Sequence, residues 1–366
     1  MGGPHGIGIV GLGNISRQYL DTLARHPAVR IVAVADLDPS RSAEVAADLP
    51  GARALTVERL LDSPDVQTVL NLTIPAAHAE IALAALAHGK DVYGEKPLAV
   101  TLDQARSILD RAAAAGRTVG CAPDIVLGTG TQTARAAIDA GLIGRPLAAS
   151  AVMVTPGHER WHPNPDFYYT DGGGPLLDMG PYYLSALVQL LGPIRSVTGA
   201  ASRLRGERVI GSGARAGQSI PVEVDSHVSG VLEHVSGVLT TITTSFDGVV
   251  STAAPIEVHG ESGTLAVPDP NYFDGEVRVF ALGGSQWRVL EPSAGYVAGS
   301  RGIGLLDQIA ANGRPPRADG GLALHVLEAM TALLRSAAEG RRLQLTTAPE
   351  RPAPVPFTPH LNGTSR

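Results

Sequence analysis

The chain has 366 residues, 44% of them hydrophobic and 17% charged, which is enough for two domains with separate cores. A formal net charge of −6 without a basic run argues against a nucleic-acid partner. The single cysteine, Cys121, excludes an intrachain disulfide, and no segment approaches the roughly 18 consecutive apolar residues of a membrane span. Because the N-terminus also lacks the basic start and apolar stretch of a signal peptide, we expect a cytoplasmic protein.

Apolar runs alternate with helical patterns over the first third of the chain. These patterns predict buried strands at residues 7–10, 29–35, 68–72, 91–93 and 117–121. Helices are predicted between them, at residues 14–25 and 76–88 and after the helix-start signals near residues 38 and 101. This rhythm is typical of βαβ units, so the fold class is α/β, with a doubly wound parallel Rossmann sheet in residues 1–124.

The pattern changes after about residue 146. Long strands are predicted at residues 148–155, 195–204, 222–233 and 238–246, and shorter ones at 255–258, 264–267, 276–280 and 287–290. Substantial helices are predicted only at residues 176–191 and 322–338. We therefore expect an α+β domain over residues 125–345 with a mostly antiparallel open sheet, whose late helix (321–340) is able to pack back on the first domain. A Pro-rich tail, 346–366, completes the chain.

The segment Gly11-Leu-Gly13-Asn14-Ile15-Ser16 follows a predicted strand and opens a predicted helix, which is the context of a dinucleotide-binding fingerprint. Gly11 permits the tight turn, and Gly13 lets the backbone approach a pyrophosphate whose charge lies at the helix N-terminus. Ser16 replaces the third glycine, a position that only serves helix–strand packing. Taken alone, the pattern also fits an ordinary glycine turn.

Asp36 ends the second predicted strand, at about the distance from the loop where an acidic residue accepts ribose hydroxyl protons. A carboxylate there repels a 2′-phosphate, so we expect NAD as cofactor. NADP is the alternative, because Arg41 lies nearby in the sequence. Asp36 otherwise caps the turn that leads to Pro39.

Glu95-Lys96-Pro97 follows the predicted strand 91–93, at the carboxyl edge of the sheet where doubly wound folds bind ligands. A lysine beside a nicotinamide holds a substrate hydroxyl and eases its deprotonation. The tripeptide is common on protein surfaces, and it is its place late in the βαβ series, downstream of the glycine loop, that makes it a candidate site.

Together these motifs resemble those of the glucose–fructose oxidoreductase/inositol dehydrogenase (Gfo/Idh/MocA) family. The resemblance covers roughly residues 6–340 and is carried by the glycine loop, Asp36, Thr73-Ile-Pro75 with His78, Glu95-Lys96-Pro97, and Gly172-Gly-Gly-Pro-Leu-Leu-Asp178-Met-Gly180. It implies NAD(P)-linked oxidation or reduction of a sugar, polyol or related carbohydrate. It also implies an open second sheet through which the chain forms a homo-oligomer, a dimer or tetramer.

Residue by residue, Lys96 matches the family's lysine that contacts substrate and nicotinamide, and Asp178 matches the aspartate of an Asp-x-Gly-x-His pattern. This sequence has Tyr182 where histidine is usual. The cofactor-binding residues that we expect are Gly11, Gly13, Asn14, Ile15, Asp36, Thr73, Pro75, His78, Glu95 and Lys96.

A tyrosine is able to replace the histidine chemically. Histidine titrates near ~6.5 and free tyrosine near ~10, but an ammonium beside a phenol favours the ionised form. We therefore expect Lys96, Tyr182 and Asp178 to be catalytic: Tyr182 takes the substrate hydroxyl proton while hydride passes to the nicotinamide, and Asp178 bonds the substrate and orients Lys96. The alternative is that Tyr182 is a packed aromatic of its helix.

The segment His158-Glu-Arg-Trp161-His162 fits the H-E-x-x-H pattern of zinc proteases. That pattern needs a continuous helix, and prolines flank this segment on both sides, so we expect no metal. We expect instead a loop over residues 157–171 that recognises a sugar, or else a plain surface loop. Asp124 follows the last strand of the series and should face the same cleft, or be a solvated turn residue. The expected substrate-binding residues are Lys96, Asp124, His158, Trp161, His162, Asp178 and Tyr182.

The function expected from the sequence is an NAD(P)-dependent sugar or polyol dehydrogenase acting on CH–OH donors. Some proteins of the family that it resembles hydrolyse glycosides through transient NAD redox chemistry, so a redox-assisted glycosidase is one alternative. A non-catalytic, dinucleotide-sensing regulator is the other. The presence of Lys96, Asp178 and Tyr182 argues against a pure sensor, which needs none of them.

Overall fold

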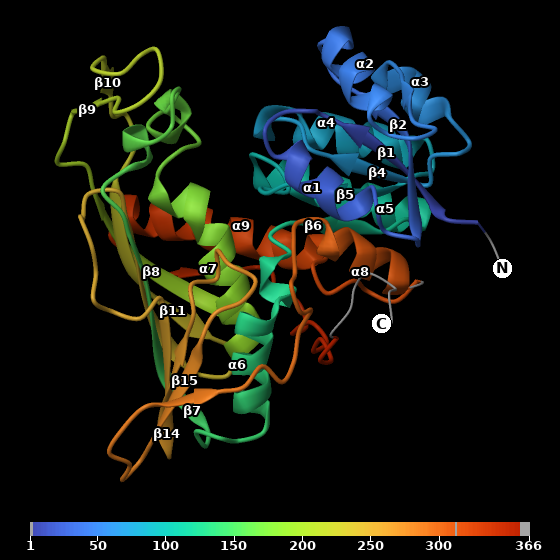
Figure 1. The fold of residues 1–366 in the computed structure, drawn as a ribbon. Helices are drawn as coiled ribbons and strands as arrows, with labels where there is room; N and C mark the ends of the chain where they lie inside the picture. The colour runs from blue at the N-terminus through green and yellow to red at the C-terminus, as the bar shows by residue number, and fades with distance from the viewer. Residues whose placement is uncertain (1–2, 312, 359–366) are drawn as a thin grey trace. The chain divides into compact units, whose positions relative to one another are not determined.

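The computed structural model describes residues 3–311 and 313–358, which form two compact units (Figure 1). The first unit contains residues 3–128, Gly295–Leu324 and 352–358, and the second contains Thr129–Ala294 and His325–Arg351. The sequence predicts a single boundary after residue 124 and a separate tail from residue 346. The structure differs because segments from the C-terminal third complete the core of the first unit.

The first unit is built on six parallel strands in the order β3-β2-β1-β4-β5-β6. The strands are β1 (His5–Val10), β2 (Val29–Ala35), β3 (Arg53–Ala54), β4 (Thr68–Asn71), β5 (Asp91–Gly94) and β6 (Val119–Cys121). The central strands are buried almost throughout, as expected for parallel strands covered on both faces. This strand order is that of the doubly wound dinucleotide-binding fold, so the predicted parallel sheet is confirmed.

The helices of the first unit begin and end largely where local sequence signals place them. They are α1 (Ser16–Leu23), α2 (Pro39–Ala47), α3 (Val57–Asp62), α4 (Pro75–Ala87), α5 (Leu102–Ala115) and α8 (Ile303–Ala311). Asp38 caps α2 and Thr101 caps α5 through backbone N–H groups of the first turn, and Gly116 ends α5 with a φ of 60°. Helix α8 was not predicted. Its residues Leu305 and Leu306 join the core around β1 and β2, a contact that no local pattern reveals.

The second unit is built on a nine-stranded sheet in the order β16-β15-β14-β13-β7-β12-β11-β8-β17. The strands are β7 (Pro146–Val154), β8 (Ile194–Ser202), β11 (His227–His234), β12 (Leu239–Ser245), β13 (Ile256–Gly260), β14 (Gly263–Val267), β15 (Val277–Ala281), β16 (Arg288–Leu290) and β17 (Leu343–Gln344). Every neighbouring pair is antiparallel except β7 and β12, so the mostly antiparallel sheet is confirmed. A separate ribbon of β9 (Glu207–Val209) and β10 (Ser219–Pro221) was not predicted.

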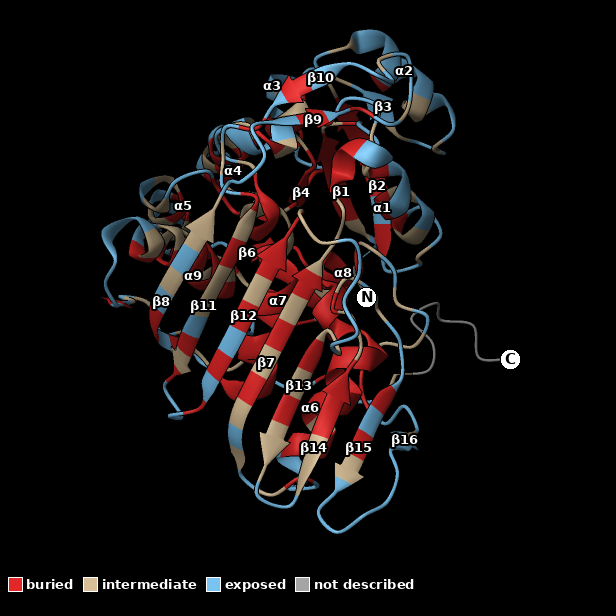
Figure 2. Cartoon of the chain, turned by 90° about the vertical axis from the view of Figure 1, so that its left-hand side faces the viewer, coloured by how far each residue is buried: buried red, intermediate tan, exposed pale blue. Residues whose placement is uncertain are grey.

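One face of this sheet packs against α6 (Thr129–Asp139), α7 (Pro175–Leu191) and the second-unit part of α9 (Gly320–Glu339). In β7, residues Ala149, Ala151 and Met153 are buried, while Ser150 and Val152 alternate to the other face, which is open in Figure 2. Within the described part of the chain, no helix is both long and apolar enough to cross a membrane.

Candidate active site

The glycine loop joins β1 to α1 at the carboxyl end of the parallel sheet. Gly11 has a φ of +93°, and a Cβ there would lie 2.6 Å from the Leu72 backbone, so only glycine fits. Nothing lies within 4 Å of the position that a Cβ of Gly13 would occupy, which leaves the backbone accessible to a ligand. The buried Ser16 hydroxyl donates to the Gly13 carbonyl at 2.7 Å and closes the start of α1. The loop therefore fits a pyrophosphate at a helix N-terminus.

Asp36 directly follows β2 and faces the same loop. Its carboxylate accepts hydrogen bonds from the backbone N–H of Leu12 at 2.8 Å and Asp38 at 2.9 Å, and it pairs with Arg41 at 3.2 Å. Partial burial acts to raise the pKa of Asp36, but the two N–H groups and Arg41 together hold it below its usual value. The group is thus a carboxylate at neutral pH, and its charge opposes a 2′-phosphate, while the exposed Arg41 offsets part of that charge.

The residues between β4 and α4 form a braced turn. Thr73 donates its hydroxyl proton to the Asn71 side chain at 2.6 Å, and Pro75 is the first residue of α4. His78 is buried, and its ring nitrogens lie 2.6 Å from the Pro97 carbonyl and 3.0 Å from the Thr73 carbonyl. His78 therefore ties this turn to the segment after β5 as an internal brace, and its predicted contact with the cofactor stays a prediction.

Glu95 lies at the end of β5 and holds the backbone of Lys96. Its buried carboxylate accepts from the Tyr19 hydroxyl of α1 at 2.9 Å, from Arg301 at 3.1 Å and from the Lys96 backbone N–H at 3.0 Å. Glu95 therefore links α1 and Arg301 to the backbone of Lys96, and its predicted contact with the cofactor stays a prediction. Sequence reasoning missed Arg301, because 206 residues separate it from Glu95.

Asp124 follows β6 but does not line a cleft. It is fully buried, and its Oδ2 accepts the backbone N–H groups of Gly302 at 2.8 Å and Gly304 at 3.0 Å. Burial raises the pKa of Asp124 to about 6. Both sequence interpretations, a substrate ligand and a solvated turn residue, are wrong, because the unpredicted segment leading into α8 covers this carboxyl group.

Helix α7 carries the two predicted catalytic residues of the second unit. Asp178 and Tyr182 are four residues apart and therefore lie on one face of the helix. Close packing requires glycine at position 173 before α7, since a Cβ there would lie 2.5 Å from the Phe167 carbonyl oxygen. Asp178 and Tyr182 are thus brought together within the second unit, while Lys96 lies in the first.

The loop that contains the H-E-x-x-H pattern turns toward Asp178. His158 starts a single 3-10 turn, His158–Arg160, and its Nε2 lies 3.0 Å from Asp178 Oδ2. The indole N–H of Trp161 donates to His158 Nδ1 at 3.3 Å, and the ring of His162 meets that of Trp161 edge-on. No continuous helix forms, and among the described residues no three His, Cys, Asp or Glu side chains gather as metal ligands would.

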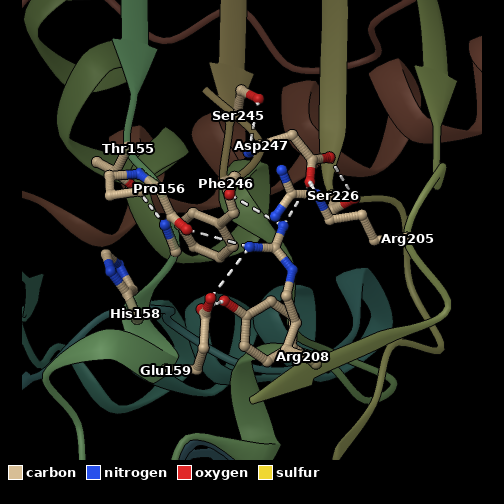
Figure 3. Close-up of polar contacts among 12 residues, drawn as sticks. Thr155, Pro156, His158, Glu159, Arg205, Arg208, Ser226, Ser245, Phe246 and Asp247 are labelled. Carbon is tan, nitrogen blue, oxygen red and sulfur yellow. Dashed lines mark hydrogen bonds and ion pairs between the residues drawn. The ribbon is translucent and has the colours of Figure 1, made fainter. Parts of the chain in front are cut away.

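A buried ionic network anchors this loop to the sheet (Figure 3). Arg208 lies between Glu159, at 3.1 Å, and Asp247, at 2.5 Å, and also donates to the Phe246 carbonyl at 2.9 Å. The Tyr169 hydroxyl donates to Glu159 from the other side. Sequence reasoning missed Arg208, because the network joins segments that meet only through the folded sheet.

Two family profiles match the chain in succession. The profile described as "Oxidoreductase family, NAD-binding Rossmann fold" covers residues 5–122, and "GFO/IDH/MocA C-terminal domain" covers residues 131–266. A 1,5-anhydro-D-fructose reductase of Ensifer adhaerens is 30% identical over 263 residues, which span 70% of this chain and 74% of that enzyme. The chain belongs to the Gfo/Idh/MocA family.

A further relative and two solved structures are similar to this chain. An inositol 2-dehydrogenase of Pseudomonas fluorescens is 34% identical over 150 residues, 38% of this chain and 43% of the relative. An NAD-binding oxidoreductase from Klebsiella pneumoniae has the same fold, with a TM-score of 0.81, 23% identity, and coverage of 94% of this chain and 100% of that one. A levoglucosan dehydrogenase in complex with NADH also has this fold, with a TM-score of 0.78 and 21% sequence identity. The match covers 94% of this chain and 100% of that one. The predicted family, fold class and NAD-binding Rossmann domain are confirmed.

Proposed function

We propose that this protein is an NAD(P)-dependent dehydrogenase that interconverts a CH–OH group and a keto carbon of a sugar, polyol or related carbohydrate. The observation that carries the proposal is the position of Lys96. It follows β5 in the same parallel sheet whose β1–α1 loop fits a dinucleotide, so both lie at the carboxyl edge of that sheet. The relatives named for anhydrofructose, inositol and levoglucosan support a carbohydrate-like substrate.

The mechanism assigns one role to each residue. NAD, when bound, supplies the acceptor for the hydride that leaves the substrate carbon. The Lys96 ammonium donates a hydrogen bond to the substrate hydroxyl oxygen and stabilises the negative charge that develops there. Tyr182, as its phenolate, takes the proton of that hydroxyl as the C=O bond forms, and Asp178 accepts a hydrogen bond from the substrate.

The loop over residues 157–171 supplies the sugar contacts in this proposal. Trp161 is 59% exposed, so its ring face is accessible to the apolar carbons of a sugar ring. His162 lies beside it and offers an imidazole to hydroxyl groups. His158 is already bonded on both ring nitrogens, so it contributes through its neighbours.

A spectrophotometric screen tests this function. Sugars, inositols and aldonates are offered with NAD⁺ and with NADP⁺, and the absorbance of the reduced cofactor is followed. We expect turnover of at least one of these, faster with NAD⁺, and a loss of about 10²- to 10⁴-fold in kcat for Lys96→Ala. Glycoside cleavage without net NADH release would instead show a glycosidase, and dinucleotide binding without any turnover would show a regulator.

We also propose a homo-oligomer formed through the open face of the second-unit sheet. On that face β7 and β12 carry the uncharged side chains of Ser150, Val152, Thr241 and Thr243, which suit packing against a second copy, and Glu257 of β13 lies beside Ser150. A charge placed there, as in Thr241→Lys, should shift the molar mass measured by light scattering toward that of the monomer.

The proposed compartment remains the cytoplasm, where the buried Cys121 stays reduced.

A further inference from the structure

The hydrogen bonds around His158 define which of its nitrogens carries the proton. An indole N–H only donates, so His158 Nδ1, which lies 3.3 Å from Trp161 Nε1, must be the acceptor. A neutral imidazole has one donor and one acceptor. The proton is therefore on Nε2, which donates to Asp178 Oδ2 at 3.0 Å.

The ring of His158 is also held in place by its neighbours. The centroid of the Tyr168 ring lies 4.7 Å away, edge-on, and that of Phe246 lies 4.5 Å away. The next residue, Glu159, is tied to the buried Arg208 on the adjoining side of the loop (Figure 3). The imidazole therefore has little freedom to rotate, and the direction of its Nε2–H is set by the fold.

We propose that His158 is a positioning residue that holds the Asp178 carboxylate in one orientation, with its own tautomer set by Trp161. The Asp178 side chain is 19% exposed, and the hydrogen bond from His158 to one of its oxygens restricts the rotation of the carboxylate. A hydrogen bond donated to a carboxylate also favours its ionised form, the form that accepts from a substrate hydroxyl. The first histidine of the H-E-x-x-H segment thus serves the aspartate to which the proposed mechanism gives a catalytic role. The role of that aspartate rests on the proposed function.

The tautomer is tested without any substrate. Long-range ¹H–¹⁵N spectra of the full chain, labelled with ¹⁵N-histidine and recorded at alkaline pH, report which imidazole nitrogen carries hydrogen. His158→Gln identifies the resonances of His158 by their loss. We expect the Nε2–H form, an Nε2 resonance that shifts in Asp178→Asn, and an Nδ1 resonance that shifts in Trp161→Phe. An Nδ1–H form, or no response to Asp178→Asn, overturns the proposal.

Kinetics test the consequence once the screen has found a substrate. His158→Phe keeps an aromatic ring without a donor, and we expect its kcat to fall roughly 10- to 100-fold with a smaller change in KM. His158→Gln keeps an N–H donor of similar reach and should recover most of the loss. His259→Gln, a half-buried histidine of β13, is the matched control and should behave as the wild type. An equal loss of kcat in His158→Phe and His158→Gln, with thermal unfolding unchanged in both, would contradict a positioning role of His158. If no substrate turns over, the proposed function fails, while the spectra still decide the tautomer of His158 and its contact with Asp178.

Discussion

Asp124 illustrates how a single buried residue departs from its local sequence context. Its Oδ1, like the hydroxyl of the neighbouring Tyr93, has no hydrogen-bond partner among the residues that the structure describes. Burial raises the pKa of this carboxyl group to about 6. The carboxyl therefore binds a proton more readily in the folded chain than in the unfolded chain, where its pKa is about 3.9.

From this shift we predict a pH-dependent stability. The contribution of Asp124 to the free energy of unfolding should fall as the pH rises from about 4 to about 6, because the folded chain holds this proton to a higher pH than the unfolded chain does. Asp124→Asn has no such titration and should be more stable than the wild type at pH 7, by up to about 3 kcal/mol, with no such advantage near pH 4. Urea unfolding at both pH values measures the difference, with the exposed Asp110→Asn as control. Equal destabilisation of Asp124→Asn at both pH values would refute the assignment.

The two glycines of the cofactor loop should respond differently to alanine. Gly11→Ala places a Cβ 2.6 Å from the Leu72 backbone at a positive φ, and we expect a loss of about 1–3 kcal/mol in unfolding free energy together with weaker NAD⁺ binding. Gly13→Ala has open space for its Cβ, so its stability should stay near wild type while NAD⁺ binding is weakened. Thermal unfolding and calorimetric titration with NAD⁺ separate the two. Wild-type affinity in Gly13→Ala would place the pyrophosphate elsewhere.

At the scale of elements, the segment that leads into α8 stabilises the cofactor-binding sheet. Arg301 from this segment pairs with Glu95, and both side chains are about nine-tenths buried. Gly302 and Gly304 bond Asp124 in the same stretch. The segment that holds Glu95, the residue before Lys96, therefore comes from the C-terminal part of the chain.

Removing one partner of this ion pair should leave a buried, unpaired charge. We expect Arg301→Met to lower the unfolding free energy by about 3 kcal/mol, and the double variant with Glu95→Gln to lose clearly less than the sum of the two single variants. Arg106→Met, which breaks an exposed pair with Asp103, is the control and should cost under about 1 kcal/mol. Chemical unfolding of the wild type, the two single variants and the double variant completes the cycle. Strictly additive losses of unfolding free energy would show that Arg301 and Glu95 act independently.

At the scale of the whole molecule, the first unit is discontinuous in sequence. Its core around β1 and β2 includes Leu305 and Leu306 of α8, and Cys121 of β6 donates its backbone N–H to Ala318. A fragment that ends after β6, the last strand of the dinucleotide-binding sheet, therefore lacks part of the core of its own domain.

We predict that a chain ending at residue 128 does not fold cooperatively. Near-UV circular dichroism and urea unfolding should show no sharp transition, because the apolar surface that α8 covers would be exposed. Joining residues 295–324 to the same fragment through a flexible linker should restore the transition. A cooperative transition in the short fragment alone would show that the later segments are dispensable.

The sequence by itself determined the features that depend on neighbouring residues. The glycine loop between a strand and a helix, the acidic residue at Asp36, Lys96 after a strand and the pairing of Asp178 with Tyr182 on one helix all follow from patterns within a few tens of residues. The pattern of apolar residues likewise predicted both sheets. A strand buried on one face alternates apolar and polar residues, and a strand buried on both faces is apolar throughout.

Only the tertiary structure decided which side chains meet across the fold. Arg301 on Glu95, the enclosure of Asp124, the Arg208 network and the contact of His158 with Asp178 each join distant segments, and side chains at such separations leave no common pattern in the sequence. The physical reason is that these contacts form where packed elements bring buried polar groups together, and each such group must then find a partner from whatever segment lies beside it.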